Sequence, residues 1–320
     1  MPDANALLVF KLREVIINMI NSLNGYIDEN FYSQETIAEN LIIKEISVEG
    51  ETKLTARLEE DYEYNLFNNL LYDIHLRKFY HYTSFENLFK IIDCGKLHLN
   101  SLIGLNDKSE VDFVNNFMGK GFANPHHPVP VAYHNTHFIF CLSENVDQLN
   151  QWRLYGDDAA GAMLEFDIDH QMFSDKSMKI SKITYDLKLF EIIKDWLAYC
   201  RDDLNISFGF YQIDYWKFFY KNKDYQDEKE VRLLLKNSLN ENKPSFIPEK
   251  YKLNRYGIIV PYVEINCLGS DSDLIRLKNI MLGPKCDEAD IKVAQIRYML
   301  SRRYPGFEIH VCKSRIDHYR

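Results

Sequence analysis

The stretch KFYHYTSFENLF at residues 78–89 decides the fold, because its hydrophobic period changes in the middle. The first half is rich in aromatic residues, which are enriched in strands. From Phe85 onward, apolar residues recur at intervals of three and four, which is typical of one face of a helix. The sequence therefore predicts a strand that turns directly into a short helix, with His81 near the end of the strand.

The residues around that helix indicate its limits. Thr83 is followed three residues later by Glu86, which is a capping box, so we expect the helix to begin at the threonine. Gly95 can adopt the left-handed conformation that ends a helix. Leu97 and Leu99 then alternate with polar residues, which predicts a second strand.

Length and composition limit the classes of protein to consider. The chain has 320 residues, of which 46% are hydrophobic, and a formal charge of −9. This charge argues against a large phosphate-binding surface, although it is compatible with a local basic groove. Six scattered cysteines without a CxxC pair indicate reduced thiols and a cytoplasmic location. Charged residues interrupt the apolar run at 6–20, so we expect no membrane span.

Residues 1–77 are predicted to form a separate helical segment. An apolar helical face covers residues 7–20, and 36–46 and 54–76 are expected to add two more helices. We find no chemical motif in this segment, so we expect a helical cap or a surface for a partner or for self-association. Residues 78–320 are predicted to form the second domain.

Four histidines crowd a loop rich in glycine and proline: His126, His127, His134 and His137. Imidazoles this close together can bind zinc. However, their spacing matches no ligand pattern, and no carboxylate or thiol is placed to complete a tetrahedron. We therefore expect no metal.

The stretch FIFCL at 138–142 predicts another strand, which ends at Ser143. A helical turn, QWRLY at 151–155, then carries large amphipathic side chains. In one interpretation Trp152 packs inward and Arg153 pairs with an acid. In the other, Trp152 or Tyr155 offers a flat ring to an aromatic ligand. The residues alone leave both interpretations open.

A third informative stretch, DEKEVRLLL at 227–235, is also predicted to be a strand. Strand periodicity places Glu228, Glu230 and Arg232 on one face. These residues can form a solvated surface ladder. They can equally form a site in which Arg232 keeps Glu230 ionised and ready to bond a hydroxyl.

Six motifs occur in order along the chain, namely YHYTS (80–84), LND (105–107), FCLSE (140–144), QWRLYG (151–156), EKEVR (228–232) and MLGP (281–284). Together they resemble a widespread bacterial family of unknown function that is grouped with the ADP-ribosyltransferase-like superfamily. The resemblance covers roughly residues 78–320. It implies an α+β fold in which a split, mixed or antiparallel β-sheet with flanking helices clasps NAD.

The resemblance also implies roles for particular residues. The first motif strand of the superfamily carries His-x-Thr, which His81 and Thr83 match. The third carries Glu-x-Glu, which Glu228 and Glu230 match. The second carries a Ser or Tyr around nicotinamide, and no residue here matches it closely. The expected catalytic residues are Glu230 and His81, the expected NAD-binding residues are His81, Tyr82, Thr83, Ser143, Trp152, Arg153, Tyr155 and Arg232, and Glu228 is expected on the acceptor side.

The chemistry implied is cleavage of the nicotinamide–ribose bond, with NAD as substrate and no metal. Glu230 would bond the ribose 2′-hydroxyl and stabilise the positive charge that develops on the ribose. His81 would hold a ribose hydroxyl, Trp152 or Tyr155 the nicotinamide ring, and Arg153 the pyrophosphate. We expect one cleft to bring His81, Ser143 and Glu230 together, although His81 also fits a core histidine at a strand end.

Two functions follow from this resemblance. The first is an NAD-dependent ADP-ribosyltransferase or NAD glycohydrolase, a toxin or defence effector by analogy, acting on an unknown acceptor macromolecule. The second is a catalytically inactive module that binds a nucleotide or a protein through the same cleft. His81 and Glu230 favour the enzyme, and the poorly matched second motif favours the binding module.

Overall fold

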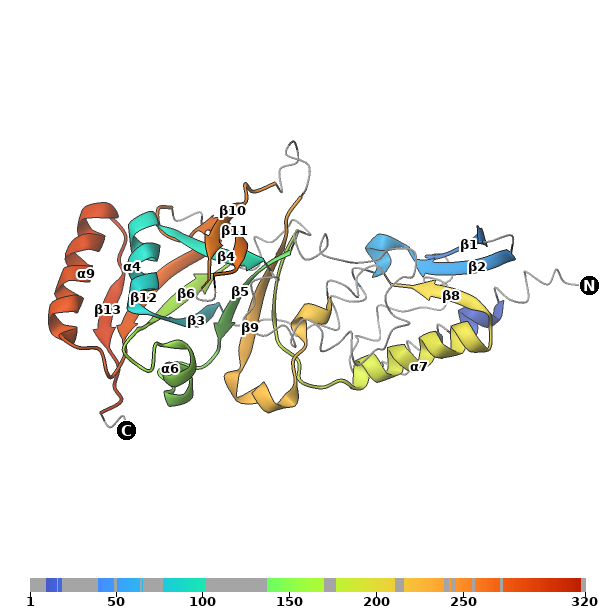
Figure 1. The fold of residues 1–320 in the computed structure, drawn as a ribbon, viewed down its shortest axis with the longest axis horizontal. Helices are drawn as coiled ribbons and strands as arrows, with labels where there is room; N and C mark the ends of the chain where they lie inside the picture. The colour runs from blue at the N-terminus through green and yellow to red at the C-terminus, as the bar shows by residue number, and fades with distance from the viewer. Residues whose placement is uncertain are drawn as a thin grey trace, which may run out of the picture. The chain divides into compact units, whose positions relative to one another are not determined.

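The computed structural model describes residues 10–15, 17–18, 40–48, 51–63, 65, 77–101, 137–169, 177–210, 216–238, 242, 246–254, 257–270 and 273–317. The chain divides into two compact units (Figure 1). Unit 1 comprises residues 1–73, 109–129 and 184–223, and unit 2 comprises residues 74–108, 130–183 and 224–320. Each unit is built from three separate stretches of the sequence. The predicted division into domains between residues 77 and 78 stays a prediction.

Unit 1 contains a small sheet. Strands β1 (Leu41–Val48) and β2 (Glu51–Leu58) form an antiparallel hairpin, and β8 (Ile206–Gly209) runs parallel to β2. Helix α7 (Lys188–Asp202) places Trp196 against two phenylalanines that follow, with ring centroids 4.3 Å from Phe208 and 5.4 Å from Phe210.

The hairpin corrects part of the helical prediction for residues 1–77. Residues 10–15 and 17–18 are helical as expected, but 41–48 and 51–58 are strands. The reason is an alternation with a period of two: Ala56 and Leu58 are buried, while Arg57 between them is half-buried. This pattern is typical of a strand with one covered face, and it outweighs the helical spacing of the leucines.

Unit 2 is α+β, as predicted. Among the described residues its sheet has ten strands in the order β10-β11-β4-β5-β3-β6-β12-β13, with β9 pairing with β5 and β7. Pairing is antiparallel except between β12 and β13. The strands are β3 (Lys78–Thr83), β4 (Lys96–Ser101), β5 (His137–Ser143), β6 (Ala162–Ile168), β7 (Met178–Lys182), β9 (Glu230–Lys236), β10 (Lys250–Leu253), β11 (Ile259–Asn266), β12 (Ile275–Leu282) and β13 (His310–Lys313).

The sheet parts between β3 and β5. Strand β3 pairs with β6 along its whole length, but it meets β5 only at Tyr80 and Ser143. The other edge of β5 pairs with β9 from His137 to Ser143. Among the described residues, one residue pair therefore joins β3, β6, β12 and β13 to the other strands of the sheet.

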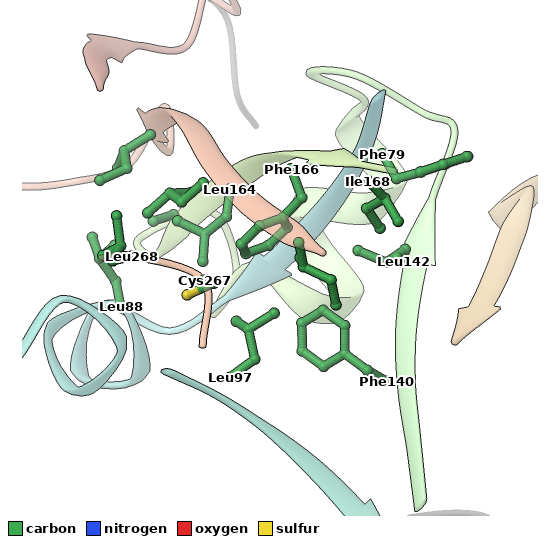
Figure 2. Close-up of a cluster of buried hydrophobic side chains, with 14 of the residues drawn as sticks. Phe79, Leu88, Leu97, Phe140, Leu142, Leu164, Phe166, Ile168, Cys267 and Leu268 are labelled. Atoms are coloured by element: carbon green, nitrogen blue, oxygen red, sulfur yellow. The ribbon is translucent and has the colours of Figure 1, made fainter. Parts of the chain in front are cut away.

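One face of the sheet forms the main core. It gathers every second residue of β5, β6 and β9, together with α4 (Phe85–Cys94) and α9 (Ala289–Arg303). Figure 2 shows Leu88 of α4 with Phe140, Leu142, Leu164 and Phe166 in this cluster. The opposite face carries a smaller cluster, in which Trp152 of α6 (Leu149–Tyr155) packs with the side chains of β3 and β6.

The start of α4 differs from the prediction by one residue. Ser84 caps the helix, because its hydroxyl accepts a hydrogen bond from the Asn87 amide, and Thr83 is the last residue of β3. Gly95 ends the helix in the left-handed conformation (φ 70°), as predicted. A Cβ at Gly95 would lie 3.0 Å from the Leu268 carbonyl oxygen, so the close packing there also favours glycine.

Strand β12 contains a bulge between Leu277 and Asn279, where its pairing with β6 shifts by one residue. Ile275 and Leu277 before the bulge, and Ile280 and Leu282 after it, all reach the same core. The extra residue, Lys278, is exposed. The bulge therefore lets odd and even positions of one strand share a face.

Candidate functional site

Three strands bring motif residues into one row. Ser143 of β5 lies opposite Tyr80 of β3 on one side and opposite Glu230 of β9 on the other. Residues directly opposite one another in antiparallel strands share a face. Tyr80, Ser143 and Glu230 therefore lie side by side at the point where β3 leaves β5, and Arg232 follows on the same face.

Glu230 and Arg232 form a buried bidentate ion pair. The Arg232 Nε lies 2.6 Å from Glu230 Oε1, and its Nη2 lies 3.1 Å from Oε2. The side chains are only 7% and 3% exposed, which excludes the solvated ladder that the sequence allowed. A fork of two parallel hydrogen bonds from guanidinium is made to an ionised carboxylate. The site therefore holds a fixed negative charge and a fixed positive charge.

Glu228 does not share the strand, contrary to the predicted alternation. It ends the 3₁₀ helix η5 (Lys223–Glu228), and β9 begins only at Glu230. Lys229 between them has φ 42°, in the left-handed region that is unfavourable for a residue with a Cβ. We call residues 227–229 the Glu228 turn.

Side chains from the preceding motifs hold the Glu228 turn in place. The Glu228 carbonyl accepts hydrogen bonds from Ser143 Oγ (2.7 Å), Gln151 Nε2 (3.2 Å) and Asn145 Nδ2 (3.3 Å). Asn145 Nδ2 also donates to the Asp227 carbonyl (2.8 Å), while the Asn145 amide donates to Ser143 Oγ (3.0 Å). Ser143 therefore supports the turn with both its donor and its acceptor.

Asn145 and Gln151 were missed by the sequence analysis. Both stand within or beside quoted motifs, FCLSE and QWRLYG, and both carry amides that can bond two backbone groups. Their closeness in sequence to Ser143 and Tyr155 was the only signal that could have identified them. No spacing rule connects these motifs to residue 228.

Tyr155 reaches the side chain of the same residue. Its hydroxyl donates to Glu228 Oε1 at 2.7 Å, although the residue is 45% exposed. Tyr155 is therefore a ring at the surface whose polar end is anchored at the candidate site. Arg153, on the same helical turn, is exposed, and it makes no ion pair within the part of the chain that the structure describes.

Trp152 packs inward, which is the first of the two interpretations. Its ring is fully buried, its edge meets Tyr82 at 4.9 Å between centroids, and its Nε1 donates to Asp147 Oδ1 at 2.8 Å. A Cβ at Gly156 would approach this ring within 2.6 Å. No face of Trp152 is left for a ligand ring.

Tyr82 and Thr83 are also buried. The Tyr82 hydroxyl donates to the Asn145 carbonyl (3.0 Å) and accepts from the Gln148 amide (3.1 Å), and burial raises its pKa. Tyr82 thus links β3 to the loop that leads into α6.

His81 lies on the other face from Glu230. It is one residue away from Tyr80, and successive strand residues point to opposite faces. Its ring packs on Phe140 of the main core, with centroids 4.5 Å apart. Of the three residues expected together, Ser143 and Glu230 therefore share a face with Tyr80, and the strand alternation directs His81 to the other face.

The protonation of His81 follows from its contacts. Its Nδ1 lies 2.9 Å from the Cys141 carbonyl oxygen, which can only accept, so Nδ1 carries the proton and Nε2 the lone pair. Burial lowers the pKa of His81, and the hydrogen bond to Cys141 opposes this effect only in part. His81 is therefore neutral at pH 7.

The sequence analysis expected no metal site and no membrane span, and most of the residues concerned lie outside the described part of the chain. His126, His127 and His134 lie outside the described residues, as do 105–107, and His137 is a buried residue of β5. Within the described ranges, no group of three or more His, Cys, Asp or Glu side chains is placed to hold a metal ion. No helix in those ranges is long and apolar enough to cross a membrane.

The fold and the site together define an α+β domain in which the buried Glu230–Arg232 ion pair lies beside the hydrogen-bonded Glu228 turn. A domain of unknown function, DUF2971, is found at residues 151–233, so its match begins in α6 and ends within β9. No curated protein matches the chain, and no solved structure matches it. The grouping with the ADP-ribosyltransferase-like superfamily and the roles of the site residues stay predictions.

Proposed function

We propose that this chain is an NAD-dependent ADP-ribosyltransferase or NAD glycohydrolase with Glu230 as its catalytic carboxylate. The observation that carries the proposal is the buried Glu230–Arg232 pair where β3 leaves β5. A buried ion pair contributes little net stability, because desolvation offsets the attraction. Its presence is better explained by a need for fixed charge at a functional site.

In the proposed reaction, the bond between nicotinamide and ribose C1′ breaks and its electron pair leaves with nicotinamide. Positive charge then develops on the ribose, as in glycoside cleavage. Glu230, kept ionised by Arg232, would accept a hydrogen bond from the ribose 2′-hydroxyl and stabilise that charge. Water or a nucleophile of the acceptor macromolecule then bonds to C1′ and loses a proton. Glu228, anchored by Tyr155, is suited to orient the acceptor.

His81 enters this proposal as a positioning residue. It bonds the carbonyl of Cys141, and Cys141 lies opposite Arg232 in the register of β5 and β9. A fixed β5 therefore supports the strand that carries the ion pair. By analogy with the superfamily, the enzyme would be a bacterial toxin or defence effector that acts in the cytoplasm.

A binding module without activity is the second candidate, and a specific observation favours it. Ser143 and Trp152, two of the residues expected around NAD, are committed to hydrogen bonds or packing within the fold, and His81 faces the other way. A domain of this kind would bind a nucleotide or a protein without cleaving it.

The test is to incubate the full chain with NAD and to measure released nicotinamide by chromatography. Glu230→Gln keeps the shape and removes the charge, so we expect NAD binding by calorimetry within a few-fold of the parent. We expect turnover to fall about 100- to 1,000-fold. Glu86→Gln is the matched control, because Glu86 is an exposed acid on α4 paired with Lys90. Circular dichroism at the assay temperature confirms that each variant is folded.

Each outcome distinguishes the candidates. NAD binding without nicotinamide release identifies the binding module. If the chain neither binds NAD nor releases nicotinamide, the proposed enzyme is overturned, and so is a module that binds NAD. Release that survives Glu230→Gln within a few-fold of the parent removes Glu230 from the reaction.

A further inference from the structure

A positive cluster is formed by residues of three other strands of the same sheet and of helix α4. In the register of β4, β11 and β10, Glu264 lies opposite His98, and Tyr262 lies opposite Lys250 (Figure 1). Lys252 follows two residues after Lys250, on the same face. The Lys252 cluster is defined as Lys90, Lys96, His98, Lys250, Lys252, Tyr262 and Glu264.

Lys252 has no acidic partner among the residues that the structure describes. Its Nζ lies 5.1 Å from the centroid of the Tyr262 ring, and within the described part of the chain it makes no ion pair or hydrogen bond. Its side chain is partly buried over the ring. Burial lowers the pKa of Lys252, and the neighbouring charge of Lys90 lowers it further. An ammonium group that is partly desolvated beside a second one is stabilised by any anion that reaches both.

The nearby carboxylate is already engaged. Glu264 bonds Lys250 at 2.8 Å and Lys96 at 3.0 Å, and it lies 3.8 Å from His98 Nε2. Lys90 is paired with Glu86. Four lysines thus share two carboxylates in a chain whose formal charge is −9. The local charge is opposite in sign to that of the whole protein.

The pKa of His98 is affected by the same charged groups. Its ring packs on Tyr262, with centroids 4.4 Å apart. Burial lowers the pKa of His98 first, and Lys252, Lys250 and Lys90 lower it further, while Glu264 alone among these neighbours raises it. The groups around His98 therefore favour its neutral form. This agrees with the excess of lysines over carboxylates in the cluster.

We propose that the Lys252 cluster binds a phosphate or pyrophosphate group. Lysine ammoniums are point charges suited to a compact oxyanion with several negative oxygens. The cluster contains no arginine, so it would hold the group by point charges and not by a bidentate guanidinium fork. The site shares no residue with the Glu230 row, so its test is independent of the proposed activity.

The experiment is an NMR titration of the full chain that follows the His98 ring resonances. Inorganic phosphate, pyrophosphate and AMP are added in parallel at constant ionic strength, with chloride as the replaced anion. We expect saturable shifts at His98 and a higher pKa for His98 in the bound state, because a bound anion favours the imidazolium. Tighter binding of AMP than of phosphate would assign the group to a nucleotide, and equal affinity would assign it to phosphate alone.

Substitutions locate the site. Lys252→Met keeps the alkyl stem over Tyr262 and removes the charge, so we expect affinity to fall about tenfold, and Lys252→Arg should restore most of it. Lys285→Met is the control, since Lys285 is an exposed lysine paired with Asp158 elsewhere in unit 2. Linear shifts at His98 that do not saturate would overturn the proposal. Equal affinity in Lys252→Met and Lys285→Met would overturn it as well.

Discussion

Arg232 and Leu233 are neighbours in β9, both are buried, and they point to opposite faces of the sheet. Leu233 joins Phe140 and Leu142 in the main core, where many interchangeable contacts share the stabilisation. Arg232 makes a bidentate ion pair with the carboxylate of Glu230. On the apolar face, a small change therefore removes only part of the stabilising free energy. On the polar face, loss of one contact leaves a buried polar group unsatisfied, at the full desolvation cost of that group.

The most damaging change should be Arg232→Met. It removes the guanidinium that pairs with the buried Glu230 carboxylate, so we expect the free energy of unfolding to fall by about 3–5 kcal/mol, measured by urea denaturation. Arg77→Met is the control, because Arg77 is half exposed beside Asp167 and should cost about 0–1 kcal/mol. The double variant Arg232→Met with Glu230→Gln should be more stable than Arg232→Met alone. A double variant that is less stable would contradict the buried charge as the cause.

Leu233→Ala makes the matched change on the apolar face. We expect a loss of about 2–5 kcal/mol from lost transfer energy and the remaining cavity, at or below the loss for Arg232→Met. Leu253→Ala is the control, since Leu253 is 69% exposed, and it should stay within about 0.5 kcal/mol of the parent. A larger loss for Leu233→Ala than for Arg232→Met would reverse the comparison of the faces.

Ser143→Ala tests the contacts that hold the Glu228 turn. It removes a donor to Glu228 and an acceptor for the Asn145 amide, so we expect a loss of about 1–3 kcal/mol. Hydrogen exchange at the Asn145 amide should become faster. Ser301→Ala provides the comparison, because Ser301 bonds only its own helix at the surface. Unchanged exchange at Asn145 would show that the turn does not depend on Ser143.

The smallest effect should be a pH dependence from His81. Its pKa is lowered in the folded protein, so the unfolded chain binds more protons between the folded value and the ordinary 6.5. Stability should therefore fall as pH decreases below 6.5. His81→Asn should flatten this slope, and His98→Asn should be measured beside it because the pKa of His98 is also lowered. A slope unchanged in His81→Asn would contradict a lowered pKa for His81 in the folded protein.

The sequence predicts well those elements whose period is clear. The change from strand to helix at 78–89, the strand that ends at Ser143 and the left-handed Gly95 all follow from local pattern. The hairpin at 41–58 was missed because its leucines also fit a helical spacing. In such segments, pairing with a partner strand decides the structure.

The candidate site was less predictable, for physical reasons. The residue types and spacing of Glu230 and Arg232 fit an exposed ladder of charges as well as a buried ion pair. Only the burial seen in the structure distinguishes the two arrangements. The left-handed Lys229 cannot be read from its residue type, since non-glycine residues seldom adopt that conformation. The face of His81 follows from simple alternation, whereas the motif His-x-Thr carries no information about which face of β3 its residues occupy.

The bulge in β12 bears on how relatives of this chain should be compared. Lys278 shifts the phase of the strand by one, so that Ile275 and Ile280 face the same way although five positions separate them. A relative without the bulge can keep the same core with one residue fewer. An alignment that forbids a single gap at position 278 would then pair core residues with surface residues along half of the strand. Substitution patterns from such an alignment would make β12 look unrelated to a strand, and a gap placed there would restore the match.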